Sequence, residues 1–462
     1  MKLYSENKDY KLYQGSMLDM LEVIEPNSID SVICDPPYEL NFMNKGWDNS
    51  GIAFQSDTWQ KCYEVLKPGG YLLAFGGSRT FHRIACAIED AGFEIRDTIM
   101  WLYGSGFPKS QNIGKMYDKK MGNKREIVGE TKIGKTSLGD GSGWNTSQNM
   151  KDIKAIGKID ITKGTSQFEG WGSALKPSYE PIIVARKPFK GSLVDNVIEN
   201  GVGGINIDEC RVEATGEIMS RPFNNIKDDT VFNINNSGYK KLGNPNNVSD
   251  KLGRFPANTI LTYDETDFDE VCGGFPNTKT GWTNKDITRS KENINVDFGV
   301  KVGMTGNHYE DSGSASRYFY CAKASKKDRD EGLETFEAKQ KYYCDGRGNS
   351  LEIFGSTDGG RKPLKNIHPT VKPTELMQYL IRLVSPKGAV ILDPFNGSGS
   401  TGKAVMYENK ERNKDYKYIG IELTEEYLPI AQARIEYVCN LIEEEKTQDK
   451  QITIFDLESE VN

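Results

Sequence analysis

Several absences limit what this chain of 462 residues can be. It has no apolar run long enough to span a bilayer, and its first fifteen residues lack the apolar core of a secretion signal. Its eight cysteines form no C-x-x-C pair, and its three histidines are far apart in the sequence. Because disulfides need an oxidising compartment and structural zinc needs closely spaced ligands, we expect a cytoplasmic protein without disulfides, metal or membrane segment.

An excess of positive charge is also missing, which at first argues against a nucleic-acid partner. The formal net charge is −7, but it is unevenly distributed. Residues 101–190 carry 16 Lys and Arg against 8 Asp and Glu, a local net of +8, whereas residues 421–462 carry 3 against 11, a local net of −8. The acidic end therefore masks a basic middle. Such a stretch can be merely a solvated surface, so charge alone does not establish DNA binding.

Regular alternation of strand and helix patterns is present at both ends of the chain. Strands are expected at residues 10–14, 31–34, 71–75, 94–102, 179–186, 389–392 and 418–421. Helices are expected at residues 17–23, 55–66, 80–91, 374–384 and 425–445, with a further one beginning at 402. This alternation predicts a doubly wound α/β fold with a mostly parallel sheet covered by helices on both faces.

The middle of the chain lacks this regularity. Residues 104–177 are rich in Gly, Ser, Asn and Lys and are expected to form a flexible basic insertion. Residues 178–190 return to a strand of the α/β domain, and residues 191–345 are expected to form a second domain of uncertain fold. The α/β domain is thus divided into residues 1–103 and 346–442, followed by an acidic tail at 443–462.

A glycine-rich loop follows the expected strand at residues 389–392. Gly397, Gly399 and Gly402 match the pattern G-x-G-x-x-G between a strand and a helix, and Glu422 follows twenty residues later. Glycine allows the backbone to approach a ligand closely and to turn tightly into a helix. A carboxylate at the end of the next strand can bind a ribose diol. The pattern therefore predicts a site for a nucleoside-containing ligand.

Three ligands compete for this loop. A dinucleotide is possible, although a dinucleotide-binding domain usually begins with such a loop. A P-loop is nearly matched, but Ala404 follows Lys403 where a magnesium-binding hydroxyl is required. The third ligand is S-adenosylmethionine. The glycine pattern alone does not separate the three.

A rigid turn follows the expected buried strand at residues 31–34. It consists of Asp35, Pro36, Pro37 and Tyr38. The prolines fix φ, remove two N–H donors and disfavour the helical region for the residue before them. The turn therefore projects a carboxylate, an aromatic ring and free carbonyls at the carboxyl end of a sheet, where ligands bind in open α/β folds. Pro-Pro turns without a function are common, so the tetrapeptide does not decide the function alone.

Together, DPPY at 35–38 and DPFNGSGSTG at 393–402 resemble the β-class of DNA amino-methyltransferases, which carry these motifs in this permuted order. GSMLDML at 15–21, HPTVKP at 368–373 and GIEL at 420–423 extend the resemblance, and GFPKS at 106–110 resembles phage and prophage members. The resemblance implies S-adenosylmethionine as cofactor and double-stranded DNA as substrate. It also implies a seven-stranded methyltransferase sheet with a target-recognition domain at residues 191–345.

The resemblance assigns catalysis to Asp35, Pro36, Pro37 and Tyr38. Asp35 and the Pro36 carbonyl would accept the two N–H bonds of an exocyclic amine, and Tyr38 would stack on a flipped base. The cofactor-binding residues that it implies are Asp19, Thr370, Lys372, Asp393, Phe395, Gly397, Gly399 and Glu422. Asp19 would bind the adenine amine of the cofactor, Glu422 its ribose, and Thr370 and Lys372 its amino-acid end.

The choice of base depends on one residue. In this class an aspartate at the first loop position favours N6 of adenine, whereas N4-cytosine enzymes more often carry serine there. Asp35 therefore predicts an N6-adenine enzyme, and N4-cytosine methylation is the alternative. Remoter alternatives are an NAD-dependent oxidoreductase, which leaves the DPPY loop without a purpose, and an inactive DNA-binding module.

The acidic tail contains a second, shorter resemblance. Gln451, Ile454 and Phe455 lie in QITIF, which resembles the peptide with which bacterial proteins dock on the replication sliding clamp. A final strand packed on the parent domain is the other interpretation. We further expect a nucleoid-associated enzyme of a bacterial or phage-infected cell, and homodimers are common in the class.

Overall fold

The computed structural model describes most of the chain in fourteen segments. They are residues 1–40, 50–103, 110–132, 158–212, 233–234, 237–238, 253–263, 277–280, 311–314, 320–323, 326–338, 343–344, 350–351 and 365–460. Among these residues, no helix is both long enough and apolar enough to cross a membrane.

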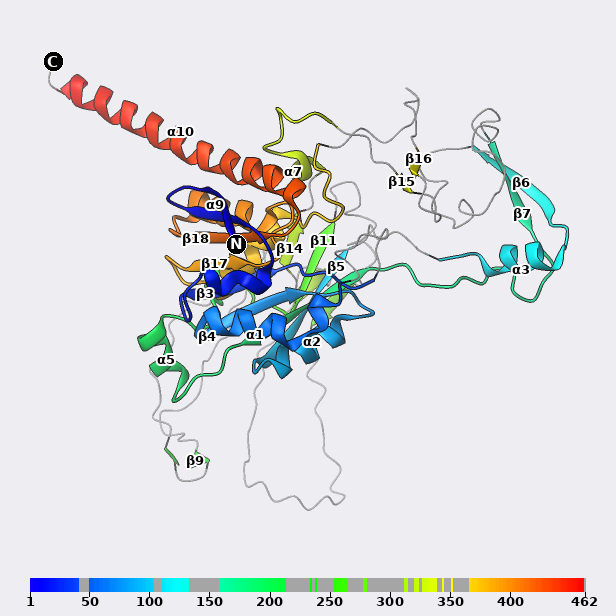
Figure 1. The fold of residues 1–462 in the computed structure, drawn as a ribbon, viewed down its shortest axis with the longest axis horizontal. Helices are drawn as coiled ribbons and strands as arrows, with labels where there is room; N and C mark the ends of the chain where they lie inside the picture. Colours follow the sequence, from blue (N-terminus) through cyan, green and yellow to red (C-terminus); the bar gives the residue numbers. More distant parts are fainter. Residues whose placement is uncertain are drawn as a thin grey trace.

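A ten-stranded sheet forms the centre of the molecule (Figure 1). From one edge to the other, its strands are β1 (Lys2–Glu6), β2 (Tyr10–Gln14), β18 (Lys417–Glu422), β17 (Val390–Asp393), β3 (Ile29–Cys34), β4 (Leu66–Phe75), β8 (Tyr179–Arg186), β5 (Glu94–Tyr103), β11 (Thr259–Tyr263) and β14 (Tyr320–Lys323). Neighbours pair in parallel except at β1–β2 and on both sides of β8. The predicted doubly wound, mostly parallel α/β fold is confirmed, although the sheet has more strands than the seven expected.

The two halves of the α/β domain meet at strands β3 and β17. Ile391 pairs with Ser31 and Leu392 with Val32, so segments some 360 residues apart become neighbours. Two buried polar side chains of β3 fasten the junction. Asp30 accepts a hydrogen bond from the backbone N–H of Val390 at 2.7 Å, and the Ser31 hydroxyl lies 2.7 Å from that of Ser385.

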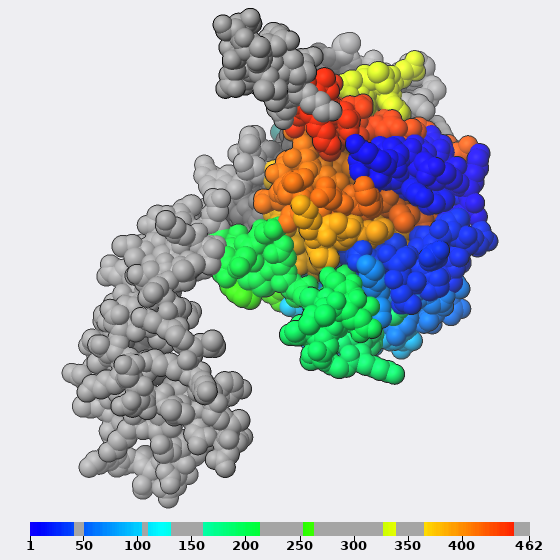
Figure 2. All heavy atoms as spheres, turned by 90° about the vertical axis from the view of Figure 1, so that its left-hand side faces the viewer, coloured from blue at the N-terminus to red at the C-terminus, as the bar shows by residue number. Residues whose placement is uncertain are grey.

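Helices cover both faces of this sheet. One face packs against α8 (Thr374–Val384), α9 (Ser400–Arg412) and the first turns of α10 (Leu428–Glu460). The other face packs against the 3₁₀ helix η1 (Met17–Glu22), α1 (Ser56–Val65) and α2 (Phe81–Asp90). In Figure 2 the amino-terminal residues and the carboxy-terminal half lie side by side in one continuous body.

The insertion expected at residues 104–177 has more regular structure than its composition suggested. It contains helix α3 (Ile113–Met121) and an antiparallel hairpin of β6 (Glu126–Lys132) and β7 (Lys158–Lys163), which project away from the sheet (Figure 1). The Arg125 guanidinium ties the unit together, because it bonds Asp118 and lies 2.8 Å from Glu169. These contacts could not be predicted from the sequence, because Glu169 lies 44 residues from Arg125 along the chain.

The second expected domain, residues 191–345, contributes to the main sheet. Strands β11 and β14 extend it in parallel beside β5, and the Trp101 indole donates a buried 2.7 Å hydrogen bond to Thr262 of β11. The expected boundaries stay predictions, but these two strands belong to the same sheet as the α/β domain. The other elements among the described residues of this region are short, namely α5 (Leu193–Asn200), η5 (Asp208–Cys210), β9 (Asn233–Ile234), β10 (Ser237–Gly238), β12 (Asn277–Thr280), β13 (Asp311–Ser314), α7 (Lys326–Asp330) and β15 (Tyr343–Cys344).

Three smaller expectations need correction. The expected helix at 17–23 is a 3₁₀ helix, and β4 begins at Leu66, directly after α1, so the strand is longer than the predicted 71–75. A short strand β16 (Ser350–Leu351) pairs with β15, and two 3₁₀ turns, η4 (Ile52–Phe54) and η8 (Glu425–Tyr427), precede α1 and α10. Helix α10 continues to Glu460, so the tail is helical there and does not form the final strand that was the other interpretation. Its Gln, Glu, Lys and Asp residues permit a helix as readily as a solvated coil.

Candidate functional site

The carboxyl ends of the parallel strands gather the predicted residues at one edge of the sheet. Asp35 directly follows β3, Asp393 is the last residue of β17 and Glu422 is the last residue of β18. Because β17 lies between β18 and β3, the three carboxylates follow neighbouring strands. Strand β8 runs in the opposite direction, so its first residues, Tyr179 and Glu180, reach the same edge.

The Asp35 carboxylate has two unlike oxygens. Its Oδ2 lies 2.5 Å from the Lys372 Nζ. Its Oδ1 is buried and has no hydrogen-bond partner within the described residues. An orphan buried acceptor is costly, so this oxygen is suited to a donor that arrives with a substrate.

Tyr38 is held both at its side-chain hydroxyl and at its backbone carbonyl. Its hydroxyl donates a 2.7 Å hydrogen bond to Glu180 and accepts one from Lys372 at 3.2 Å, and its carbonyl accepts one from Thr80. Burial, together with the charges of Asp35 and Glu180, raises the pKa of Tyr38 well above its usual 10.0. The ring is therefore neutral and cannot swing freely.

Glu180 was not predicted from the sequence. It accepts hydrogen bonds from Tyr38 and, at 3.4 Å, from Tyr103, and its carboxylate lies 3.4 Å from the Lys372 Nζ. A signal was available, because Glu180 is a charged residue at the start of a strand whose last six residues are buried.

The glycine loop bends around the Glu422 carboxylate. Glu422 accepts hydrogen bonds from the N–H of Gly397 and of Thr424, both at 2.7 Å. Burial raises the pKa of Glu422 above its usual value, although these bonds oppose the shift. Gly397 adopts φ +52°, and a Cβ there would come within 2.9 Å of the His368 ring. Glycine is therefore required by both backbone conformation and space.

His368 packs under this loop as a neutral ring. Its Nδ1 lies 2.6 Å from the Thr370 carbonyl, and its ring centroid lies 4.6 Å from that of Tyr427 in an edge-to-face contact. Burial, more than the neighbouring cations, lowers the pKa of His368 to about 3. The HPTVKP segment thus contacts the glycine loop through its histidine.

Asp393 is buried at the end of β17, the strand between the one that precedes Asp35 and the one that ends at Glu422. It accepts hydrogen bonds from the N–H of Phe395 at 3.0 Å and from the Thr401 hydroxyl at 2.5 Å. Burial raises the pKa of Asp393 to about 7, and the charges of Asp35 and Glu422 add to the shift. A carboxyl group that titrates near neutral pH is typical of a ligand-binding site.

The structure divides the predicted residues into two adjoining groups. Asp35, Pro36, Pro37 and Tyr38 form one, and Asp393, Phe395, Gly397, Gly399 and Glu422 form the other, with Phe395 lying 6.2 Å from Trp59 between ring centroids. Asp19 and Thr370 are exposed. The Lys372 ammonium, which the resemblance assigned to the amino-acid end of the cofactor, contacts Asp35 and the Tyr38 hydroxyl.

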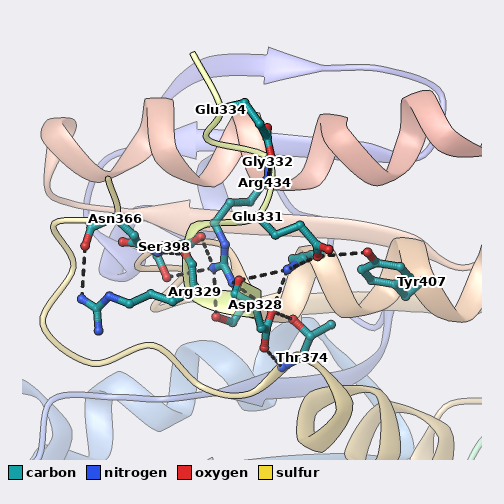
Figure 3. A network of polar contacts seen from close by, with 12 residues as sticks. Asp328, Arg329, Glu331, Gly332, Glu334, Asn366, Thr374, Ser398, Tyr407 and Arg434 are labelled. Carbon is teal, nitrogen blue, oxygen red and sulfur yellow. Dashed lines mark hydrogen bonds and ion pairs between the residues drawn. The ribbon is translucent and has the colours of Figure 1, made fainter. Parts of the chain in front are cut away.

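Lys403, the lysine that made the loop similar to a P-loop, is fully buried in an ion-pair network. Figure 3 labels three members of this network, Asp328, Glu331 and Tyr407. Its Nζ lies 2.6 Å from Asp328 and 2.7 Å from Glu331, which also accepts a hydrogen bond from Tyr407. Thr374 donates to Asp328 through both its backbone N–H and its hydroxyl. A lysine committed in this way is not available to a phosphate, which argues against a P-loop.

Arg434 of α10 fixes the loop from behind (Figure 3). Its buried guanidinium donates to the Ser398 carbonyl at 2.8 Å and to the Ser400 hydroxyl at 3.1 Å. A Cβ at Gly399, where φ is +74°, would come within 2.9 Å of the Ala431 backbone. The second glycine therefore serves close packing of the loop on α10.

No group of three His, Cys, Asp or Glu side chains is arranged to bind a metal ion within the described segments.

These features define an α/β enzyme whose glycine loop lies beside a rigid carboxylate turn at the carboxyl edge of a parallel sheet. The model of the N6_N4_Mtase family, described as DNA methylase, matches residues 29–433. The chain therefore belongs to this family and is a DNA methyltransferase, which confirms the resemblance read from the sequence.

Several curated relatives of this chain are type II methyltransferases. M2.DpnII from Streptococcus pneumoniae is 41% identical over 233 residues, covering 44% of this chain and 81% of the relative. M2.LlaDCHI from Lactococcus lactis subsp. cremoris is 24% identical over 235 residues, covering 44% and 82%. With M.HpaI from Haemophilus parainfluenzae the match is 31% over 116 residues and spans only 37% of that protein and 24% of this chain.

Solved structures of methyltransferases align along most of the chain. They include the cytosine-N4-specific PvuII DNA methyltransferase, with 11% identity, a TM-score of 0.39 and coverage of 96% of this chain and 94% of that one. The M1.HpyAVI–SAM complex aligns with 13% identity, a TM-score of 0.33 and coverage of 92% and 99%. The assignment rests on the family match.

Asp328→Ala should destabilise the protein strongly, because it leaves Lys403 and Arg434 buried without their shared carboxylate. Breaking one partner of a buried ion pair costs about 3–5 kcal/mol, which urea denaturation can measure. The control is Lys387→Ala, which removes the exposed partner of Asp415 at 3.4 Å and should change stability little. Equal effects of the two substitutions would contradict the importance of the network.

Asp393→Asn should change how stability depends on pH. The pKa of Asp393 is raised from 3.8 to about 7, so the stability that its neutral form contributes is complete below about 3.8 and is lost as pH rises through about 7. The variant should therefore gain on the wild type between pH 5 and pH 8 in urea unfolding. A difference independent of pH would show that Asp393 is ionised throughout this range.

Proposed function

We propose that this chain is an S-adenosylmethionine-dependent enzyme that methylates N6 of an adenine flipped out of duplex DNA. One observation carries the proposal. The Asp35 carboxylate has one oxygen bonded to Lys372 and a second, buried oxygen with no hydrogen-bond partner among the residues that the structure describes, directly beside the strand that leads into the glycine loop.

The residues beside Asp35 suit a cationic cofactor that bears hydroxyl groups. Asp393 and Glu422 are buried carboxylates whose pKa values are raised chiefly by burial, so a positive ligand with donors would relieve their desolvation. Glu422 would bind the ribose and Asp19 the adenine amine. Phe395, Gly397 and Gly399 would surround the methionine part, with Thr370 at its end. When bound, S-adenosylmethionine supplies an electrophilic methyl group.

The catalytic loop then provides what an exocyclic amine requires. Such an amine is a weak nucleophile because its lone pair is delocalised into the ring. Asp35 Oδ1 would accept one amine hydrogen and the Pro36 carbonyl the other, which favours a pyramidal nitrogen whose lone pair is directed at the methyl group. Asp35 would also take the proton that leaves nitrogen as the N–C bond forms. Tyr38, fixed by Glu180 and Thr80, would stack on the flipped base.

DNA binding is proposed for the two inserted regions. The basic stretch at 101–190 would contact phosphates, and residues 191–345 would read the target sequence. Family membership makes a nicotinamide oxidoreductase a poor alternative. Cytosine N4 remains the competing acceptor, because the family comprises methylases of both bases.

Asp35→Ala should abolish methylation while the cofactor still binds, because the substitution removes the acceptor of the amine and leaves the glycine loop intact. Duplex DNA treated with wild-type enzyme should contain N6-methyladenine by mass spectrometry of its nucleosides, and variant-treated DNA should not. Cofactor affinity, measured by calorimetry, should change by less than about threefold.

The matched control is Asp90→Ala at the exposed end of α2, which should retain full activity. A wild-type product of N4-methylcytosine without N6-methyladenine would overturn the choice of base. Loss of cofactor binding together with activity in Asp35→Ala would show that Asp35 belongs to the cofactor site.

A further proposal concerns the tail. Residues 451–455 lie within helix α10, so docking on a sliding clamp as an extended peptide would require the last turns to unwind. A labelled peptide of residues 446–462 should bind a bacterial clamp in fluorescence polarisation, and the same peptide with Gln451, Ile454 and Phe455 replaced by alanine should not. Equal signals from both peptides would exclude the docking motif.

A further inference from the structure

Lys372 is surrounded by side chains from four neighbouring strands of the sheet. Its Nζ lies 2.5 Å from Asp35, which follows β3, and 3.4 Å from Glu180 of β8. It also lies 4.8 Å from the ring centroid of Phe75 in β4 and 6.0 Å from that of Trp101 in β5. The ring centroid of Tyr38 lies 5.3 Å from the same Nζ.

This environment would ordinarily disfavour a charged amine. Burial by itself lowers the pKa of Lys372, but Asp35 and Glu180 outweigh it through attraction and hydrogen bonding, and the net effect raises the pKa above 10.5. Aromatic faces add to the stabilisation of a buried ammonium. The side chain is 7% exposed, so Lys372 is a charged group enclosed by the catalytic loop and its supports.

The charges in this cluster form an arrangement with one cation between two anions. Asp35 and Glu180 are partly buried carboxylates that contact the same ammonium, so without Lys372 they would lie close together with no positive charge between them. Like charges at short range disfavour ionisation of both groups, so one carboxylate would take up a proton more readily. With Lys372 between the two carboxylates, Asp35 can accept a hydrogen bond from a substrate amine while Glu180 accepts one from the Tyr38 hydroxyl.

We propose that Lys372 and Glu180 form a positioning pair for the catalytic loop, in which Lys372 binds Asp35 Oδ2 and leaves Oδ1 for the substrate amine. This inference rests on the proposed function. Glu180 fixes Tyr38 and gives Lys372 a second anchor across the site. Neither residue touches the reacting atoms, so their effect is on the ionisation and orientation of Asp35 and Tyr38. Lys372 is thereby assigned to the catalytic loop and not to the amino-acid end of the cofactor.

The test compares Lys372→Met, which keeps the length of the side chain, with Lys372→Arg, Glu180→Gln and the double variant Lys372→Met/Glu180→Gln. Lys372→Met should lower kcat about 100-fold and move the acidic limb of its pH profile to higher pH, because two carboxylates then share one site. Lys372→Arg should retain more activity than Lys372→Met. The Kd for S-adenosylmethionine should change less than about threefold in each variant.

The double variant separates a charge effect from a packing effect. Replacing Glu180 by Gln removes the second negative charge and keeps an acceptor for Tyr38, so it should restore kcat of Lys372→Met about tenfold and return the acidic limb toward that of the wild type. If Glu180→Gln instead damaged the packing of the site, its loss of activity would add to that of Lys372→Met. The groups that face Lys372 and can alter the profile are Asp35, Glu180 and Tyr38, with Tyr103 acting through Glu180.

Two outcomes would overturn the pair. One is a Lys372→Met enzyme with wild-type kcat and weakened cofactor binding, which would return the lysine to the cofactor site. The other is a double variant less active than Lys372→Met. If Lys372→Met fails to fold by circular dichroism, Glu180→Gln alone decides: an unchanged kcat and pH profile would reject the pair. A wild-type enzyme without methylation in the same assay would instead reject the proposed function.

Discussion

The parallel pairing of β3 with β17 is the constraint on which the site depends. The register that joins Leu392 to Val32 places Asp35 and Asp393 at the carboxyl ends of adjacent strands, although they are 358 residues apart in the chain. Asp30 secures the pairing, because its carboxylate accepts the N–H of Val390 and an ion pair from Lys67 at 2.6 Å. A shift of the register by one residue would reverse the faces of the strand and separate the two loops.

The edge that this pairing creates is rich in buried negative charge. Burial raises the pKa values of Asp393 and Glu422. The negative charges of Asp35 and Glu180 are instead balanced by the ammonium of Lys372. The site thus has a compensated part around Tyr38 and an uncompensated part around the glycine loop. That division matches an amine acceptor on one side and a sulfonium cofactor on the other.

Helix α7, near the end of the region at residues 191–345, helps to hold the glycine loop in place. Helix α7 follows β14 and supplies Asp328, which contacts Lys403 and Thr374 at the starts of α9 and α8. Arg329, the next residue, donates to the carbonyls of Asn366 and His368. The segment that leads out of the expected target-recognition region therefore contacts the glycine loop helix and the HPTVKP segment together, through contacts that are buried and charge-assisted.

Local patterns in the sequence determined the α/β class, the strands before both loops, the rigid DPPY turn and the glycine loop, because periodicity, proline and glycine act within a few residues of the chain. They did not reveal the partners of the loops. Lys372 meets Asp35 across 337 residues and Glu180 meets Tyr38 across 142, and such pairs arise only when strands are ordered in the sheet. The same holds for the place of β11 and β14 in the main sheet, which depends on the pairing of β11 with β5 and of β14 with β11. The sequence thus specified which chemical groups stand at the strand ends, and the tertiary structure decided which charges they face.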